Sequence, residues 1–274
     1  MSEQTLKQAT TKGLFWSSVE RFSNQGVQFV FSIILARLLS PSDYGIIAMV
    51  TIFFAVAQSF VDSGFSNALV RKTDRVEEDL STCFYFNIGV GIIAYIVLFL
   101  IAPLVANFYN QPILSPIIRI TGLGVILNSL CVVQQALFTI KIDFKSQAKI
   151  TLSATVISGI VGILLAYQGY GIWALVWQGV ASSIVRMGLL WLMSKWRPRT
   201  GFSKSSFNYL FGYGSKLLAS GLLDTIYNNI YPIVIGKFYN PAQLGNYSRA
   251  LGWAQLPSAN ITSILQRVTF PVLS

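Results

Sequence analysis

The sequence contains no histidine, only two cysteines and few charges, because Asp, Glu, Lys and Arg make up 11% of its 274 residues. An average soluble domain has about 25% charged residues. Cys83 and Cys131 lie in apolar stretches without the spacing of a zinc site, and two cysteines cannot form a disulfide framework. Paired loop carboxylates, a serine nucleophile elbow and a glycine-rich phosphate loop are also missing. The sequence therefore indicates neither an enzyme nor a protein that needs a metal or another cofactor.

Apolar residues are abundant, at 53% of the chain. The 20 basic and 10 acidic residues are too few to solvate the surface that a soluble domain of this length would expose. The net charge of +10 does not indicate nucleic-acid binding, since no polar segment interleaves Lys or Arg with aromatic residues. We therefore expect an all-α integral membrane protein without a nucleic-acid partner.

Several apolar runs are longer than the roughly 20 residues that cross a bilayer. Leu80–Ile118 and Ile150–Val185 contain no charged residue, and Gly169 with Gly171 divides the second run by a turn. The polar N-terminus has no signal-peptide core, so the first span is expected to remain in the mature protein. Eight spans are predicted, at 13–38, 44–70, 81–107, 117–138, 147–167, 172–194, 207–236 and 243–270.

Basic residues predict the orientation, because the cytoplasmic loops of membrane proteins carry an excess of Lys and Arg. With the N-terminus inside, twelve basic loop residues fall on the cytoplasmic side, and only Arg37 and Lys237 fall on the other. The twelve are Lys7, Lys12, Arg71, Lys72, Arg75, Lys141, Lys145, Lys149, Lys195, Arg197, Arg199 and Lys204. This asymmetry explains the basic net charge and predicts a cytoplasmic N-terminus.

The longest polar segment, residues 195–208, follows the sixth span and predicts a boundary. We call it the connector. It separates a six-helix lobe at 1–194 from the start of a second lobe at 209–274, where the pattern of the first loop recurs. LARLLSPSDYG at 35–45 is echoed by IGKFYNPAQLG at 235–245, although only Pro and Gly are identical. Six spans lie between the copies, so the repeat would be parallel.

Charged side chains inside spans are costly, by at least about 2.5 kcal/mol at the centre, and usually have a function or a partner. Two polar stripes recur at steps of three and four residues, which places each on one helix face. They comprise Ser17, Arg21, Asn24, Gln25 and Gln28 in the first span, and Lys216, Ser220, Asp224, Tyr227, Asn228 and Tyr231 in the seventh. The stripes either line a common wet cavity or hydrogen-bond neighbouring helices.

Three motifs, GLFWSSVERF at 13–22, LARLLSPSDYG at 35–45 and DSGFSNALVRK at 62–72, resemble the opening of the bacterial polysaccharide-transport family. This family contains the O-antigen and exopolysaccharide flippases, and the chain is most similar to the colanic-acid and teichuronic-acid branch. The resemblance implies the fold shared with multidrug-and-toxin extruders, two six-helix lobes in a V around a cavity. It also implies that this chain ends after the first two helices of the second lobe.

The resemblance further implies a substrate, an oligosaccharide on polyprenyl pyrophosphate, which is turned across the bacterial inner membrane by alternating access. Membrane lipids surround the protein, and a polysaccharide polymerase and glycosyltransferases are the expected working partners. We assign substrate binding in the cavity to four stripe residues and one further cation. We assign binding of the coupling ion to three carboxylates that lie inside the spans. These are Arg21, Gln25, Gln28, Lys216 and Arg249 for the substrate, and Glu20, Asp62 and Asp224 for the ion.

Other interpretations remain for the function and for single residues. The same fold could serve a multidrug or cation antiporter, and a membrane-bound polymerase or glycosyltransferase would need a larger outer loop than the sequence offers. Asp62 could bond its neighbours Gln58 and Ser66, while Pro257 predicts a kink in the last span. Arg119, Arg186 and Arg267 lie near enough to span ends to reach the interface.

The predicted orientation places both the N-terminus and the connector in the cytoplasm. Cysteines introduced by Ser2→Cys or Ser203→Cys should therefore resist a membrane-impermeant thiol reagent in intact cells. The background lacks Cys83 and Cys131, and permeabilised cells supply the labelled control. Labelling of either position in intact cells would overturn this topology.

Overall fold

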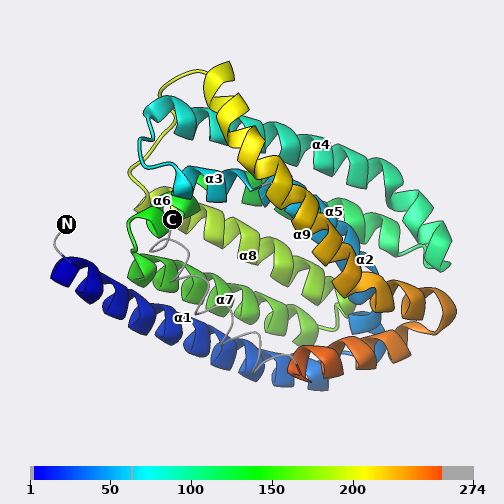
Figure 1. Ribbon diagram of the computed structural model, residues 1–274. Helices are drawn as coiled ribbons and strands as arrows, with labels where there is room; N and C mark the ends of the chain where they lie inside the picture. Colours follow the sequence, from blue (N-terminus) through cyan, green and yellow to red (C-terminus); the bar gives the residue numbers. More distant parts are fainter. Residues whose placement is uncertain (1–2, 63, 255–274) are drawn as a thin grey trace.

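The computed structural model describes residues 3–62 and 64–254, with side chains described for Val19 and from Arg21 onward. All regular structure in these ranges is helical. The helices are α1 (Glu3–Leu38), α2 (Pro41–Asp62), α3 (Phe65–Arg71), α4 (Glu77–Tyr109), α5 (Leu114–Ser129), α6 (Val132–Ile140), α7 (Phe144–Tyr167), α8 (Ile172–Met193) and α9 (Lys204–Phe238), followed by helix over 241–254 (Figure 1). The prediction of an all-helical membrane protein is confirmed in this coarse form.

Two of the expected spans are broken helices. The second span divides into α2 and α3, with Gly64 in the left-handed region at φ 69°, and the fourth divides into α5 and α6, which meet at 44°. Periodicity alone did not reveal either break. In the described ranges four segments are long and apolar enough to cross a membrane, or five if the α5–α6 pair counts as one span. The eight-span layout stays a prediction, and residues 255–270 of the last span, with Pro257 and Arg267, lie outside the described part.

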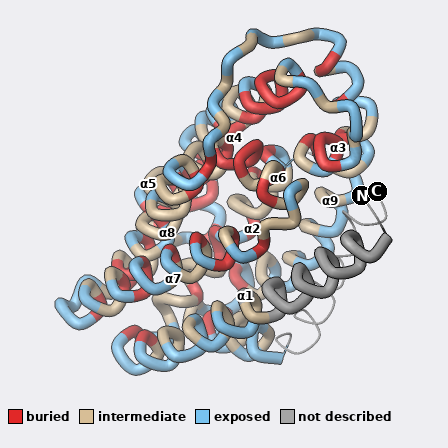
Figure 2. Tube along the Cα trace, turned by 90° about the vertical axis from the view of Figure 1, so that its left-hand side faces the viewer, coloured by how far each residue is buried: buried red, intermediate tan, exposed pale blue. Residues whose placement is uncertain are grey.

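The helices pack in a layered bundle. α7 packs between α1 and α8, α5 lies against α4 and α8, and α9 runs along α2 with further contacts to α3 and α4 (Figure 1). One apolar cluster joins α2, α4 and α5 through fully buried side chains such as Met49, Leu114 and Ile117. A second joins α3, α6 and the start of α9 around Phe65 and Leu210. Buried positions gather in α3, α6 and the start of α4, whereas α9 has few buried residues along its length (Figure 2).

The exposed surface of α4 is apolar along one face. Ile93, Leu100 and Leu104 are 64%, 66% and 67% exposed and lie at helical steps of seven and four residues. In water such a stripe would lose the hydrophobic free energy of burial, about 1.5 to 3 kcal/mol for each large side chain. Lipid chains cover it without that cost, so this face agrees with a membrane setting.

The connector is hydrogen-bonded to the start of α4. Trp196 Nε1 donates to Glu77 Oε1 at 2.9 Å, and the backbone N–H of Ser203 donates to Thr82 Oγ1 at 2.9 Å. Ser203 then caps α9 by accepting from the N–H of Ser206. The connector therefore fixes where α9 begins against the start of α4.

Two glycines of α4 allow a test of the α4–α5 packing. A Cβ at Gly91 would lie 2.5 Å from Ser129 Oγ, whereas a Cβ at Gly89 would meet nothing within 4 Å. We expect Gly91→Ala to lower the free energy of unfolding by about 1 to 3 kcal/mol through overpacking. Gly89→Ala should raise it by up to about 1 kcal/mol, because Ala favours helix. Thermal unfolding in detergent would measure both, and equal melting temperatures would contradict the packing.

Candidate functional site

The polar stripe of α1 is shared between a helix contact and an open face. Thr155 Oγ1 of α7 donates to Asn24 Oδ1 at 2.6 Å, so this stripe residue binds α1 to α7. Arg21 and Gln25 are partly buried, and Gln28 is exposed. The side chain of Glu20 lies outside the described part. One stripe residue thus acts as a helix–helix contact, and the others remain candidates for a cavity wall.

The polar stripe of α9 is exposed along its length. Its members are Lys216, Ser220, Asp224, Tyr227, Asn228 and Tyr231, and each is exposed in the described structure. The opposite edge of α9 contacts α2, where the hydroxyls of Ser59 and Thr225 lie 3.0 Å apart. Lys216 and Asp224 thus belong to an exposed polar face of α9 that is separate from the edge in contact with α2.

Arg249 is not brought together with Lys216. Its guanidinium carbon lies 4.5 Å from the centre of the Tyr44 ring, in the first turns of α2. Lys216 precedes the last residue of α9, Phe238, by 22 residues, which at 1.5 Å per residue is about 33 Å of helix. The structure therefore places these two candidate cations toward different ends of the molecule, and their joint cavity remains a prediction.

Asp62 belongs to a polar chain that crosses three helices. Gln58 Nε2 donates to Asp62 Oδ1 at 3.1 Å, and Asn128 Nδ2 of α5 donates to Gln58 Oε1 at 3.3 Å. The guanidinium of Arg186 in α8 lies close enough to act electrostatically on the Asp62 carboxylate and on the thiol of Cys131. This chain occupies the level of both helix breaks, since Asp62 ends α2 and Cys131 precedes α6.

The sequence analysis considered Arg186 only as a residue near a span end, and it did not single out Asn128. Arg186 was assigned to the interface, yet it is partly buried and lies seven residues before the end of α8 at Met193. Its position inside an apolar span was the signal, because a mid-span cation usually has a partner. Asn128 carried no separate signal, since one amide near a span end is common.

The basic loop between α3 and α4 holds the start of α9. Lys72 Nζ forms an ion pair with the fully buried Asp79 at 2.7 Å and lies 4.9 Å from the Tyr209 ring centre. Arg71 lies 4.9 Å from the Tyr213 ring centre. Cation–π contacts of this kind contribute about 0.5 to 1 kcal/mol at exposed sites. These cations are thus engaged in structure at the connector end.

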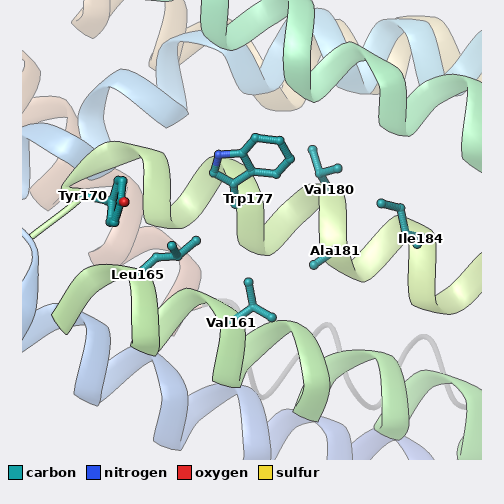
Figure 3. A pocket seen from close by; sticks show the side chains of 7 residues that line it. All are labelled: Val161, Leu165, Tyr170, Trp177, Val180, Ala181 and Ile184. Atoms are coloured by element: carbon teal, nitrogen blue, oxygen red, sulfur yellow. The ribbon is translucent and has the colours of Figure 1, made fainter. Parts of the chain in front are cut away.

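An apolar groove lies between α7 and α8, with a cavity volume of about 400 Å³ (Figure 3). Trp177, Val180, Ala181 and Ile184 of α8 line it together with Val161 and Leu165 of α7, and Tyr170 lies at one end. None of these side chains is charged, so the groove is unsuited to an anionic group. In the described residues no group of three or more Cys, Asp or Glu could hold a metal ion.

Comparison with known proteins agrees with the resemblance seen in the motifs. A family described as "Polysaccharide biosynthesis protein" matches residues 34–274. The succinoglycan biosynthesis transport protein ExoT of Rhizobium meliloti is 26% identical over 95% of this chain and 53% of its own length. The teichuronic acid biosynthesis protein TuaB of Bacillus subtilis is 26% identical over 96% of this chain and 55% of its own. The lipopolysaccharide biosynthesis protein WzxC of Escherichia coli is 22% identical over 98% of this chain and 55% of its own.

A solved structure shares the fold. The MATE multidrug transporter DinF-BH superposes with a TM-score of 0.62 over 99% of this chain and 66% of its own, at 14% sequence identity. At that identity the likeness establishes the fold alone. The chain spans about half the length of the curated relatives it matches.

A double-mutant cycle can test whether Asp62 and Arg186 interact. Each single change, Asp62→Asn or Arg186→Gln, removes one charge from an opposite pair, so the double variant should be more stable than the sum of the single effects. We expect a coupling free energy of at least about 0.5 kcal/mol from melting in detergent. Asp43→Asn, at the other end of α2, is the matched control and should be additive with Arg186→Gln. Additivity for both pairs would contradict the interaction.

Proposed function

The chain belongs to the polysaccharide biosynthesis protein family, and on this basis we propose that it forms the first lobe and the start of the second lobe of a flippase. The substrate is a polyprenyl-pyrophosphate-linked oligosaccharide, the repeat unit of a lipopolysaccharide or exopolysaccharide. The names of three relatives, which concern succinoglycan, teichuronic acid and lipopolysaccharide biosynthesis, support this substrate class. The observation that carries the proposal is this family match together with polar faces on two long helices, α1 and α9.

Such a substrate needs a polar path, because its sugar and pyrophosphate cannot enter hydrocarbon without losing their hydration. Helix faces with amides, hydroxyls and charges replace part of that hydration. α1 supplies Gln25 and Gln28 beside Arg21, and α9 supplies an exposed stripe around Lys216. The prenyl chain stays in the surrounding membrane lipid while the headgroup follows this path.

The cations hold the pyrophosphate. Arg21 offers a planar fork of donors that matches phosphate oxygens in a bidentate pair, and Lys216 offers a compact charge. Arg249 lies toward the opposite end, over Tyr44. The three cations therefore act in succession, with Arg249 receiving the headgroup at the side away from the connector.

The carboxylates couple transport to a proton or sodium gradient. Asp62 accepts from Gln58 and interacts electrostatically with Arg186, so a bound proton or sodium ion would change the charge that these two partners meet. Asp224 is exposed on α9 beside the substrate face, and Glu20 adjoins Arg21 in sequence. In this proposal, ion binding at these carboxylates alters the charge that the headgroup meets.

The two lobes work by alternating access in the bacterial inner membrane, with the N-terminus and connector in the cytoplasm. Residues 1–194 form the first lobe, 195–208 the connector and 209–274 the start of the second lobe. A polysaccharide polymerase and glycosyltransferases act before and after the chain on the same lipid carrier. The protein itself performs no covalent chemistry.

Substitution of Arg21 tests the substrate role. In cells that make the protein from its own gene, Arg21→Ala should abolish export of surface polysaccharide while the protein still inserts in the membrane. Arg21→Lys keeps the charge but loses the fork, so we expect partial export. Surface polysaccharide would be measured by extraction and gel analysis, and protein level by immunoblot of membranes.

Arg37→Ala is the matched control, because Arg37 lies in the last turn of the same helix and is exposed. It should leave export unchanged. Normal export with Arg21→Ala at normal protein level would remove Arg21 from the site. Unchanged surface polysaccharide with increased drug sensitivity after gene deletion would instead favour a drug antiporter.

A further inference from the structure

The connector carries four cations and no acidic residue. Lys195, Arg197, Arg199 and Lys204 lie within ten residues, and the sequence has no Asp or Glu over residues 144–223. All four basic side chains are exposed. The connector leaves the end of α8 and passes along the start of α4 to the start of α9 (Figure 1). A dense positive charge therefore follows directly on the end of an apolar span.

Arg197 holds the start of the connector in place. Its guanidinium donates to the carbonyl oxygens of Trp191, Ser194 and Trp196, each at 2.7 Å, and so caps the C-terminal end of α8. In the part of the chain that the structure describes, the side chains of the other three connector cations form no hydrogen bond or ion pair. The backbone around these three cations is thus fixed by its neighbours, while their charges are available to a partner outside the chain.

The neighbouring loop before α4 offsets only part of this charge. Residues 71–79 hold three basic and four acidic residues, whereas the connector holds four basic residues and no acidic one. Two of these acids already have partners, since Asp79 pairs with Lys72 and Glu77 accepts from Trp196. The other two are exposed. The two segments together therefore keep a net positive charge, and it is concentrated on the connector.

Exposed apolar side chains border these cations. Leu192, in the last turn of α8, is 81% exposed, and Phe202, within the connector, is 54% exposed. Leu192 lies three residues before Lys195, and Phe202 lies between Arg199 and Lys204. An acidic protein or a nucleic acid would not need large apolar side chains beside the cations. A phospholipid needs both, because its phosphate group pairs with cations at the membrane surface while its acyl chains lie against the apolar span.

We propose that the connector, together with the last turn of α8, binds the headgroup of an anionic phospholipid in the membrane leaflet on the connector side. Lys195, Arg199 and Lys204 supply the positive charge, and Leu192 contacts an acyl chain of the same lipid. Arg197 acts as a positioning residue, since its donors are engaged by the end of α8. The site does not depend on the transport function proposed above, because it lies outside both polar stripes.

Binding of phosphatidylglycerol to the purified full chain tests the site. The chain, in an uncharged detergent, would be titrated with dioleoylphosphatidylglycerol, and the fraction that carries one lipid would be measured by native mass spectrometry. The double substitution Lys195→Gln, Arg199→Gln should weaken this binding by about tenfold or more, because each basic residue near the membrane surface attracts anionic lipid. Both side chains are exposed, so the melting temperature without added lipid should stay unchanged. Undiminished binding in this double variant would overturn the site.

The double substitution Lys141→Gln, Lys149→Gln is the matched control. Both lysines are exposed and lie at the same end of the molecule, because Lys141 follows Ile140, which packs in one apolar cluster with Trp196, and Lys149 lies in the first turns of α7. This variant also loses two charges, yet its affinity for phosphatidylglycerol should stay close to that of the unsubstituted chain. An equal loss of binding in both double variants would show a general attraction to the basic side and would contradict a site at the connector.

The headgroup and the apolar border can be tested separately. Phosphatidylcholine has no net charge, so its weaker binding should not change in the Lys195→Gln, Arg199→Gln variant. Leu192→Ser should weaken the binding of phosphatidylglycerol while the charge of the site is unchanged. Inorganic pyrophosphate that displaces the lipid at equal concentration would show a site for a phosphate ion alone, and a protein that co-purifies with the chain and is lost with the two cations, while lipid binding persists, would show a protein partner. Either result would reject the lipid site.

Discussion

The close approach of α2 and α9 is the constraint on which the rest of the arrangement depends. Two helices can lie backbone to backbone only where side chains are absent, and glycines occur at both ends of this contact. Near one end, at the break between α2 and α3, a Cβ on Gly64 would lie 2.7 Å from the carbonyl oxygen of Gly214 in α9; near the other, just beyond α9, a Cβ on Gly45 would overlap the carbonyl oxygen of Pro241. Because one edge of α9, with Thr225 against Ser59, is taken up by α2, the exposed polar stripe of α9 lies on another face. The exposure of Lys216 and Asp224 follows from packing rather than from any property of those residues.

The polar side chains of the helices fall into two classes: some hydrogen-bond to another helix, and others lie on an exposed helix face. Asn24, Gln58 and Asn128 exchange hydrogen bonds between helices, which offsets the cost of placing them in an apolar span. Among residues 3–62 and 64–254, the stripe of α9 has no such neighbour on its exposed face. A helix that keeps such a face in a membrane needs water, another helix or a polar ligand to cover it. Asn24, Gln58 and Asn128 therefore have a structural role, whereas the exposed stripe of α9 remains a candidate for transport.

Much of the helical outline could be predicted from the sequence, because charge-free length and loop charge report directly on membrane crossing. Helix boundaries up to residue 254 lie within about four residues of the predicted ones, except that α1 begins at Glu3 rather than at residue 13. The breaks at Gly64 and before α6 were missed, since a bent span and a straight one have the same hydropathy. The interaction of Arg186 with Asp62 was not foreseen, because the distance of Arg186 to a span end was weighed without the position of Asp62. Only the fold can place those two charges near each other.

The echo between 35–45 and 235–245 shows the limit in another way. With only Pro and Gly identical, it carried little weight as a sequence match. These are the two residues at the crossing, however, where a side chain is excluded and a fixed backbone is required. The weak sequence repeat therefore marks two positions at which the backbone contact tolerates no side chain.

The separation between the two ends of α9 has a consequence for how the chain assembles during synthesis. Residues leave the ribosome in order, at about 5 to 20 per second. Phe207 can therefore meet Phe65 before Pro241 is synthesised, and the contact of Pro241 with Gly45 can form only after α9 is complete. α9 would therefore pack along α2 progressively, beginning at the connector end. An early nascent chain would already have the contact of Phe65 with Phe207 before the contact of Gly45 with Pro241 could form.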